Sequence, residues 1–365
     1  MGFKCGIVGL PNVGKSSLFN ALTSAGIATE NYPFCTIEPN IGIVVVPDKR
    51  LSAIAEIACS IKVIPSSMEF VDIAGLVAGA SKGEGLGNKF LAHIRETAAI
   101  AHVVRCFHDD NITHVSGKID PVSDIEVIEI ELALADLEAC TRGLERAEKQ
   151  AKSGDKDQKQ RAQSFKVLLN LLEAGTPVRA GNLDEGDGPA LLAKEMALLT
   201  AKPLLFVANV AEDESQGSDE AAAVVAYAEK IGAECIVLCA SIEAEIAALP
   251  EHERDEFLSD IGIAESGLDQ VIRAGHRLLG LQNYFTAGPK ESRAWTIPIG
   301  SLAPQAAGVI HTDFERGFIR AEVVAYHDFI EYKGESKARE LGKLRVEGKE
   351  YVVKDGDVMH FRFNV

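Results

Sequence analysis

The chain has 365 residues, a net charge of −17, 47% hydrophobic residues and 25% charged residues. This length suggests two or three domains, and the composition is that of an ordinary soluble globular protein. The negative charge excludes nucleic-acid binding through the whole surface, so any contact with RNA requires a local basic patch. No apolar run reaches the length of a membrane span.

The cysteines indicate a reducing compartment. There are seven of them, an odd number, and no two form a C-x-x-C pair. Several lie in apolar, strand-like runs, so we expect reduced and mostly buried thiols. The N-terminal residues pass directly into a strand-like segment, which leaves no room for a signal peptide. We therefore predict a cytoplasmic protein.

Short apolar runs alternate with helical patterns from the start of the chain. This alternation is typical of a mostly parallel sheet with helices on both faces, so the predicted fold class is α/β. The expected strands are Lys4–Val8, Ile41–Val46, Met68–Ile73, Ala101–Phe107, Pro203–Ala208 and Glu234–Ala240. The expected helices are Lys15–Ser24, Asn88–Ala99 and Glu220–Ile231.

The alternation is interrupted between about Asp124 and Thr200, where the pattern is helical. An apolar stripe runs along the first helix, Gly154 and Asp155 break it, and a second helix is expected at Gln158–Glu173. We predict an inserted helical coiled-coil arm. Its tip is basic, with acidic residues interleaved, so both a solvated arm and an arm that contacts RNA or an acidic partner fit the pattern. The stripe is formed by Ile125, Ile128, Leu132 and Leu137, and the basic residues are Arg142, Arg146, Lys149, Lys152, Lys156, Lys159, Arg161 and Lys166.

Beyond Gly280 the pattern changes again. The stretches AWTIPIG, FIRAEVVAY and YVVKDGDVMHFRFNV are strand-like, and they predict a small α+β domain with a mostly antiparallel sheet. The predicted domains are a P-loop NTPase domain at 1–123 and 200–279, a helical insert at 124–199 and a C-terminal domain at 280–365.

The clearest motif is GLPNVGKSS, which runs from Gly9 to Ser17 after the first expected strand. It fits the P-loop pattern G-x-x-x-x-G-K-[ST], with a helix expected to follow. Its glycines let backbone N–H groups point at phosphate oxygens, and the helix adds its N-terminal dipole. We predict that Lys15 contacts the β- and γ-phosphates and acts in catalysis, and that Ser16 offers its hydroxyl to Mg²⁺. The predicted nucleotide-binding residues of this loop are Asn12, Val13, Gly14, Lys15, Ser16 and Ser17.

The sequence leaves two roles open for Asn12. Some P-loop NTPases with asparagine at this place hold K⁺ beside the phosphates, which makes K⁺ a second cofactor to consider. The alternative is that Asn12 only caps the loop.

Two further segments carry the expected metal and γ-phosphate contacts. Asp72 ends the strand expected at Met68–Ile73, where an acid can hold Mg²⁺ through water. The N–H of Gly75, in the same D-x-x-G motif, can contact the γ-phosphate, and the glycine-rich sequence that follows can become ordered around it. Thr36, in NYPFCTIEPN, can supply a second hydroxyl to Mg²⁺, although an ordinary loop threonine is the alternative. The predicted metal ligands are Ser16, Thr36 and Asp72.

Leu76 follows the D-x-x-G motif, where many GTPases have a glutamine that orients the attacking water. Leucine cannot do this, so hydrolysis must be slow, use another group or need a partner. His114 is the candidate catalytic residue in the loop after the strand expected at Ala101–Phe107. A histidine on a surface loop is the alternative interpretation.

The base-recognition segment departs from that of a GTPase. GTPases read guanine with N-K-x-D, whereas this chain has Asn209, Val210, Ala211 and Glu212 after an expected strand. The lysine that would cover the base is absent, and the acid is one methylene longer. Adenine presents a hydrogen-bond donor at N6 and an acceptor at N1, which is the reverse of the guanine edge. We therefore interpret this segment as an adenine site. The stretch CASIEAE, from Cys239, follows the next strand and is expected to lie against the base.

These motifs together resemble the Obg-like ATPase family, known as YchF in bacteria. The resemblance covers essentially the whole chain and rests on MGFKCGIVGLPNVGKSSLFNALT, NYPFCTIEPN, VDIAGLVAGASKGEGLGN and NVAE. It implies a G domain, a coiled-coil insert and a C-terminal TGS domain of β-grasp fold. It also implies ATP preference over GTP, Mg²⁺ dependence, and binding to the ribosome and its large subunit, including ribosomal RNA and proteins.

The family has a hydrophobic residue in place of the catalytic glutamine, which agrees with Leu76, and its Mg²⁺ ligands correspond to Ser16 and Thr36. One departure is Ser17, where threonine is common. The expected protein is a slow, switch-like ATPase. A GTP-specific translation-factor GTPase and a non-enzymatic binding module remain alternatives.

Overall fold

We describe a computed structural model. It covers residues 3–24, 40–73, 86–115, 117–152, 155–184, 186–214, 217–260, 262–263 and 265–364. The chain divides into two compact units, one formed by Met1–Ile43 with Glu69–Val271 and the other by Val44–Met68 with Ile272–Val365.

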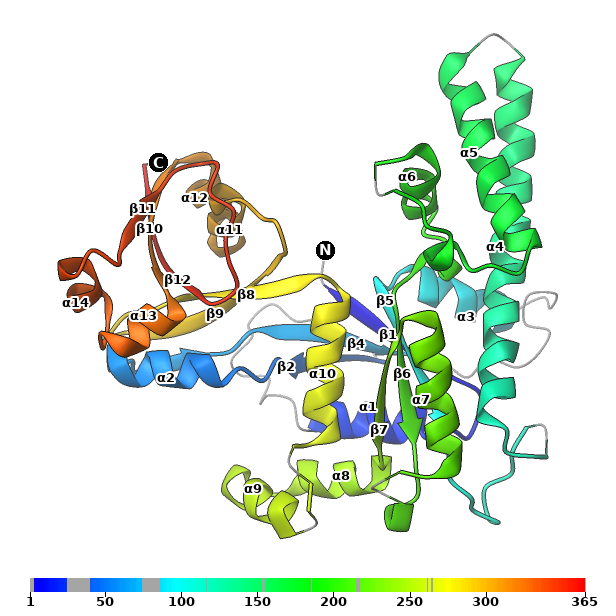
Figure 1. Ribbon diagram of the computed structural model, residues 1–365, viewed down its shortest axis with the longest axis horizontal. Helices are drawn as coiled ribbons and strands as arrows, with labels where there is room; N and C mark the ends of the chain where they lie inside the picture. Colours follow the sequence, from blue (N-terminus) through cyan, green and yellow to red (C-terminus); the bar gives the residue numbers. More distant parts are fainter. Residues whose placement is uncertain are drawn as a thin grey trace. The chain divides into compact units, whose positions relative to one another are not determined.

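A six-stranded sheet forms the centre of the first unit, in the order β2-β4-β1-β5-β6-β7 (Figure 1). β1 pairs in parallel with β4 and β5, and the pairs β5–β6 and β6–β7 are also parallel. Every residue of β5 and β6 is buried, as expected where helices cover both faces of a parallel sheet. The α/β prediction is therefore confirmed. The strands are β1 (Lys4–Val8), β2 (Ile41–Val45), β4 (Ser67–Asp72), β5 (Ala99–Arg105), β6 (Leu204–Asn209) and β7 (Glu234–Leu238).

The helices around this sheet begin and end at residues suited to capping. Ser218 accepts a hydrogen bond from the N–H of Ala221 at the start of α7, and Gly232 ends that helix with φ of 70°. α1 presents Leu18, Ala21 and Leu22 to the core. The helices are α1 (Lys15–Ser24), α3 (Leu86–Arg95), α7 (Asp219–Ile231), α8 (Ala240–Ala248), α9 (Glu251–Asp260) and α10 (Gly267–Leu278).

The register of the parallel strands decides where the functional residues meet. Ile7 lies beside Asp72, Arg105 beside Asn209, and Asn209 beside Leu238. The carboxyl ends of β1, β4, β5, β6 and β7 therefore lie along one edge of the sheet. In open α/β sheets this edge is where ligands bind.

The predicted helical arm is a hairpin of α4 (Pro121–Ala151) and α5 (Lys156–Glu173), which lie side by side in Figure 1. Asp120 and Asp155 cap the two helices, and α6 (Gly188–Glu195) packs against α5. Two short 3-10 turns, Val178–Ala180 and Leu199–Ala201, follow α5 and α6. The core of the arm is apolar and includes Cys140, Ala147, Phe165, Leu168, Leu172, Val178 and Leu192.

One buried carboxylate joins the arm to the chain that leads back to the sheet. Asp136 of α4 is fully buried and accepts hydrogen bonds from the N–H groups of Leu199 and Thr200, at 3.0 and 2.8 Å, and from the Thr200 hydroxyl. Arg95, the last residue of α3, lies 3.6 Å from the same carboxylate. Desolvation by burial raises the pKa of Asp136, and these partners offset only part of that effect.

The second unit contains another six-stranded sheet, in the order β11-β10-β12-β8-β9-β3. β12 and β8 are parallel, whereas β8–β9, β10–β12 and β10–β11 are antiparallel. When β3 is left aside, the strand order β11-β10-β12-β8-β9 is that of a β-grasp fold. In the sequence, α11 lies between the second and third strands of that fold, β9 and β10. The elements are β3 (Lys62–Ile64), β8 (Leu281–Thr286), β9 (Glu291–Pro298), β10 (Phe318–Ala325), β11 (Arg345–Glu347), β12 (Asp357–Phe363), α2 (Lys49–Ala58), α11 (Ala303–Ile310), α12 (Thr312–Arg316), α13 (Tyr326–Glu331) and α14 (Glu335–Glu340).

The position of residues 44–68 differs from the expected domain boundaries. The predicted NTPase domain contains them, whereas they are grouped with the second unit, apart from the ends of β2 and β4, which pair in the first sheet. The reason is the apolar face of α2, where Leu51 and Ile54 pack with Phe285, Ala294 and Phe329. A helical pattern shows that such a face exists, but it does not say which sheet covers it. The other predicted boundaries stay predictions.

Two further observations concern the helices and the cysteines. Within the described residues, none of the helices combines the length and the apolar character needed to cross a membrane. Four of the six described cysteines are buried: Cys5, Cys106, Cys140 and Cys239.

We expect the arm to depend on Phe165, whose side chain is 2% exposed in the apolar core of the hairpin. Phe165→Ala should lower the free energy of unfolding by about 3–5 kcal/mol, because the cavity cannot fully close. Gln163→Ala, at an exposed position of the same helix, is the control. Urea unfolding followed by circular dichroism measures both. Equal stability of the two variants would contradict this account of the arm core.

Candidate nucleotide-binding site

The P-loop connects β1 to α1 through two residues with positive φ. Asn12 has φ of 63° and Gly14 has φ of 94°. A Cβ at Gly14 would lie 2.2 Å from Nδ2 of Asn209, so glycine is required there both by the backbone conformation and by the neighbouring side chain. Gly9 is also enclosed, because a Cβ there would lie 2.5 Å from the carbonyl oxygen of Val103. The loop therefore has the conformation that the glycines of the motif predict.

Lys15 lies at the start of α1 and is folded against the loop. Its Nζ donates a hydrogen bond to the carbonyl oxygen of Leu10 at 2.6 Å, and the residue is 7% exposed. Burial lowers the pKa of Lys15 to about 8, although the negative charge of Asp72 acts in the opposite direction. This ammonium is poorly hydrated, so a phosphate group would be a favourable partner for it.

Ser16 and Asp72 meet at the same edge of the sheet. The Ser16 hydroxyl donates to Oδ2 of Asp72 at 3.3 Å, while Oδ1 of Asp72 is buried without a hydrogen-bond partner among the described residues. A hydroxyl beside a carboxylate with an unsatisfied oxygen fits the ligand preference of Mg²⁺. The described residues contain no cluster of three His, Cys, Asp or Glu side chains that could bind a metal alone.

Three predicted residues of this region, Thr36, Gly75 and Leu76, lie outside the described residues. Their roles stay predictions.

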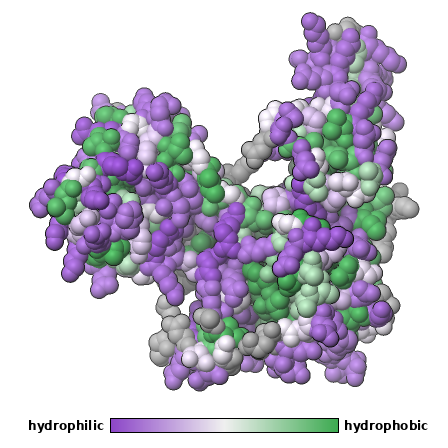
Figure 2. Space-filling model, in the orientation of Figure 1, coloured by the Kyte–Doolittle hydropathy of each residue, from purple (hydrophilic) through white to green (hydrophobic). Residues whose placement is uncertain are grey.

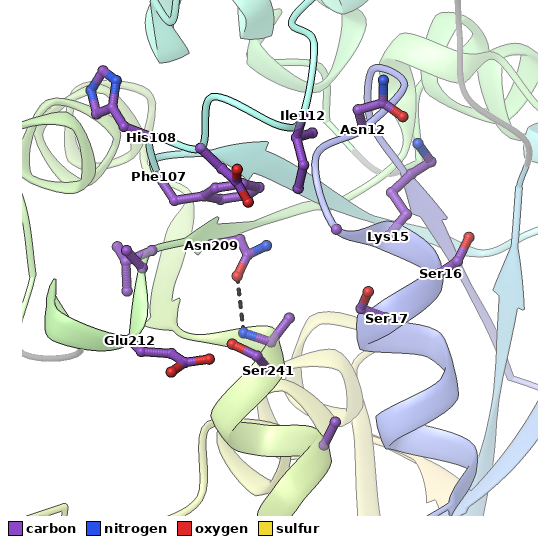
Figure 3. Close-up of a pocket in the computed structure, with 16 residues that line it drawn as sticks. Asn12, Lys15, Ser16, Ser17, Phe107, His108, Ile112, Asn209, Glu212 and Ser241 are labelled. Carbon is purple, nitrogen blue, oxygen red and sulfur yellow. Dashed lines mark hydrogen bonds between the residues drawn. The ribbon is translucent and has the colours of Figure 1, made fainter.

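Asn209 joins the phosphate loop to the segment expected to read the base. Its Nδ2 donates to the carbonyl oxygen of Val13 at 3.0 Å, and its Oδ1 accepts from the N–H of Ala240 at 2.9 Å, the bond marked in Figure 3. Asn209 is 5% exposed, so both bonds lie in a poorly solvated environment. The residue thus holds three segments together: the P-loop, the end of β6 and the start of α8.

A cavity of about 840 Å³ lies between these segments. In Figure 3, Lys15 and Glu212 lie on opposite sides of it, with Asn209 between them. The structure therefore brings together the predicted phosphate and base residues, although Val13 contributes its backbone rather than a lining side chain. The lining residues are Asn12, Gly14, Lys15, Ser16, Ser17, Phe107, His108, Asp109, Ile112, Asn209, Val210, Ala211, Glu212, Ala240, Ser241 and Ala244.

One wall of this cavity is not predicted by any motif in the sequence. It is formed by Phe107, His108, Asp109 and Ile112. These residues follow β5, whose carboxyl end lies at the same edge of the sheet as the P-loop. That position is the signal that could have identified them. No sequence motif identifies these residues, and the wall has no regular secondary structure.

His114 is not among the residues that line the cavity. Its Nε2 lies 2.9 Å from Oδ2 of Asp124 in the first turn of α4, and both side chains are buried. It is therefore not the exposed loop histidine of our alternative interpretation. Its catalytic role stays a prediction.

Asn12 has a structural contact in this region. Its Nδ2 donates to the carbonyl oxygen of Thr113 at 3.1 Å, which connects the P-loop to the loop after β5. This contact is a structural role for the side chain, and the K⁺ alternative stays a prediction.

Comparisons with known proteins agree along the whole chain. The family model YchF-GTPase_C, described as a protein of unknown function, matches residues 281–364, and MMR_HSR1, a 50S ribosome-binding GTPase, matches residues 4–134. Relatives named "Ribosome-binding ATPase YchF" are 62% identical in Haemophilus ducreyi, 58% in Escherichia coli O157:H7 and 56% in Bacillus subtilis, each covering 100% of both chains. The solved structure of the Schizosaccharomyces pombe YchF GTPase superposes with a TM-score of 0.89 at 36% identity, covering 99% of this chain and 98% of that one.

The lowered pKa of Lys15 predicts how nucleotide binding depends on pH. Below about pH 8 the free protein carries a protonated Lys15, and above it the proton must be taken up for the ammonium to contact phosphate. The Kd for ATP should be constant from about pH 7 to 8, and should then rise by up to about tenfold per pH unit. Fluorescence titration at a series of pH values measures this.

Lys15→Arg is the matched control, because its guanidinium stays protonated throughout this range. Any binding that it retains should not change with pH. A constant Kd for the unsubstituted protein up to about pH 9.5 would contradict the assigned role of Lys15.

Proposed function

The chain belongs to the YchF family, and on this basis we propose that it is a ribosome-binding ATPase that hydrolyses ATP slowly in a Mg²⁺-dependent, switch-like cycle. The observation that carries the proposal is one cavity lined by the P-loop lysine at one side and the Asn209–Glu212 segment at the other. Its volume and lining suit a nucleoside triphosphate, with phosphates at the first side and the base at the second. The proposed compartment is the cytoplasm.

The phosphates would be held by the residues at the start of α1. The backbone N–H groups of the loop and the helix N-terminus supply positive potential, and Lys15 contacts the β- and γ-phosphates. Ser16, Thr36 and Asp72 are the proposed Mg²⁺ ligands, and K⁺ beside Asn12 is a second cofactor to test. When bound, Mg²⁺ neutralises charge on the phosphate oxygens.

Slow hydrolysis follows from the residue after the D-x-x-G motif. Leu76 has no polar group to orient water, so that step depends on another group or on a partner. We propose Gly75 as a γ-phosphate contact and His114 as a catalytic residue. His114 is paired with Asp124 through Nε2 and does not line the cavity, so a catalytic role requires His114 to come closer to the γ-phosphate.

The base would be read mostly by backbone groups. The N–H of Val210 is bonded to the carbonyl oxygen of Leu238 at 3.0 Å, so the carbonyl of Val210 is the group that can accept from adenine N6. Asn209 is engaged by Val13 and Ala240, and it acts by holding the loops in place. Glu212 lines the same side of the cavity. A lysine above the base and a shorter acid, as guanine recognition requires, are both missing.

We predict that ATP outcompetes GTP by at least about tenfold, or about 1.4 kcal/mol. The double substitution Val210→Lys with Glu212→Asp restores an N-K-x-D segment and should narrow or reverse this preference. Asp213→Asn, next to Glu212 but outside the cavity lining, is the control. Competition titration with a fluorescent ATP analogue measures all three proteins. If GTP wins with the unsubstituted chain, the proposed base recognition is wrong.

We propose that the arm tip is the surface that contacts ribosomal RNA. Three of its basic side chains form ion pairs, Arg142 with Glu138, Arg161 with Glu195 and Lys166 with Glu148. Further exposed cations gather around the turn between α4 and α5, and Figure 2 shows a hydrophilic surface there. In a chain of net charge −17, this local excess of positive charge is where phosphates would bind. These cations are Arg146, Lys149, Lys152, Lys156 and Lys159.

We predict that replacing Lys149, Lys152 and Lys156 with glutamate weakens binding to the large ribosomal subunit by about tenfold or more. The salt dependence should also become shallower, by about 0.7–0.9 in log–log slope for each phosphate that the variant no longer neutralises. Sedimentation with purified subunits at several salt concentrations measures both quantities.

The control replaces three exposed lysines of the second unit, Lys337, Lys349 and Lys354, with glutamate. It changes the net charge equally and should have a smaller effect. Unchanged binding by the arm variant would show that the ribosome contact lies elsewhere.

A further inference from the structure

The cavity wall formed by Phe107, His108, Asp109 and Ile112 is irregular, and its shape must therefore be maintained by side chains behind it. Figure 3 shows Phe107 and Ile112 on the same side of the cavity, with Asn209 below them. A ligand in the cavity contacts this wall directly. Any change in the position of the wall changes the space available to the ligand.

Arg105 supports the wall from within. It is 1% exposed, and its guanidinium donates to the carbonyl oxygens of Phe107 at 3.1 Å, Ile112 at 2.9 Å and Asp109 at 3.3 Å. The guanidinium also lies 4.5 Å from the centre of the Phe107 ring. A buried arginine thus folds the loop around itself and compensates its own desolvation with three carbonyl groups.

The far end of the loop is held from two sides. The carbonyl oxygen of Thr113 accepts from Asn12 of the P-loop at 3.1 Å. The next residue, His114, is paired with Asp124 at 2.9 Å, and these two residues are 8% and 6% exposed. Asp124 belongs to the first turn of α4, the helix that continues into the arm. The pair is therefore a direct connection between the root of the arm and the wall of the cavity.

We propose that Asp124 is a positioning residue for the nucleotide site, which holds the wall 107–114 in place through His114. The inference rests on the proposed nucleotide site and adds a route by which the arm acts on it. A displacement of the first turn of α4 moves Asp124, and His114 carries that displacement to the wall. Whatever binds the arm can thereby change nucleotide affinity, and bound nucleotide can change arm binding by the same factor.

A double-mutant cycle tests the proposal in the full chain. Asp124→Ala and His114→Ala should each raise the Kd for a fluorescent ATP analogue by about fivefold to tenfold, since each removes the same buried hydrogen bond. The Kd of the double variant should lie within about twofold of the higher of the two single-variant Kd values. If the two fold-increases in Kd multiply in the double variant, Asp124 does not act through His114. That result would overturn the proposal.

Asp120→Ala is the matched control for the start of the arm helix. Asp120 caps α4 by accepting from the N–H of Ser123 at 3.3 Å, and its exposed carboxylate lies 3.6 Å from Lys118. Its loss should lower the melting temperature and leave the Kd within about twofold of that of the unsubstituted protein. A Kd raised as much as by Asp124→Ala would mean that any weakening of α4 has this effect, and the proposal would be wrong.

Two further variants distinguish failure of this inference from misfolding and from failure of the proposed nucleotide site. If Asp124→Ala does not fold, Asp124→Leu, which keeps a similar volume and has no hydrogen-bonding group, enters the same cycle with His114→Ala. Lys15→Ala tests the nucleotide site itself and should abolish binding without unfolding the chain. If Lys15→Ala still binds ATP normally, the proposed site is wrong. If it does not bind and Asp124→Ala binds normally, only the present inference is wrong.

Discussion

The buried amide of Asn209 is the interaction on which the arrangement of the site depends. Its two hydrogen bonds, to Val13 and to Ala240, join a loop near the start of the chain to the end of β6 and the beginning of α8. Without them, the phosphate loop and the proposed base segment would be separate loops at the edge of one sheet. Because the amide is almost fully buried, either bond would be costly to leave unmade. The asparagine is therefore needed whichever base is bound.

Buried charges around the same edge perform comparable connecting roles. Arg105 organises the loop after β5, Asp124 attaches that loop to the arm, and Asp136 attaches the arm to the chain that re-enters the sheet. Each charge lies in a poorly solvated place, where buried ions require polar partners; Arg105 and Asp136 have three hydrogen bonds each, and Asp124 is paired with His114. The arm thus meets the nucleotide-binding unit at more than one polar contact. These contacts are the route by which we propose that the arm and the cavity are coupled.

The distribution of charge divides the functions between surfaces. The cavity needs cationic groups for phosphate, and it has Lys15 and the N-terminus of α1. The arm tip carries exposed lysines and arginines, while the chain as a whole is strongly acidic. A strongly acidic protein is repelled by nucleic acid, so the contact proposed for the arm tip would be confined to that local basic surface.

Several features of this protein follow from local sequence, because the physical causes are local. The P-loop depends on glycines and a lysine at fixed spacing, and β1 and α1 begin and end as the pattern of Lys4–Ser24 predicts. The same holds for the alternation of strands and helices and for the hairpin of α4 and α5. Only the tertiary structure decided which distant residues meet: the wall from Phe107 to Ile112, the pairing of His114 with Asp124, and the assignment of residues 44–68 to the second unit. Those contacts depend on strand register and on which apolar faces cover one another, and neither is determined within a window of neighbouring residues.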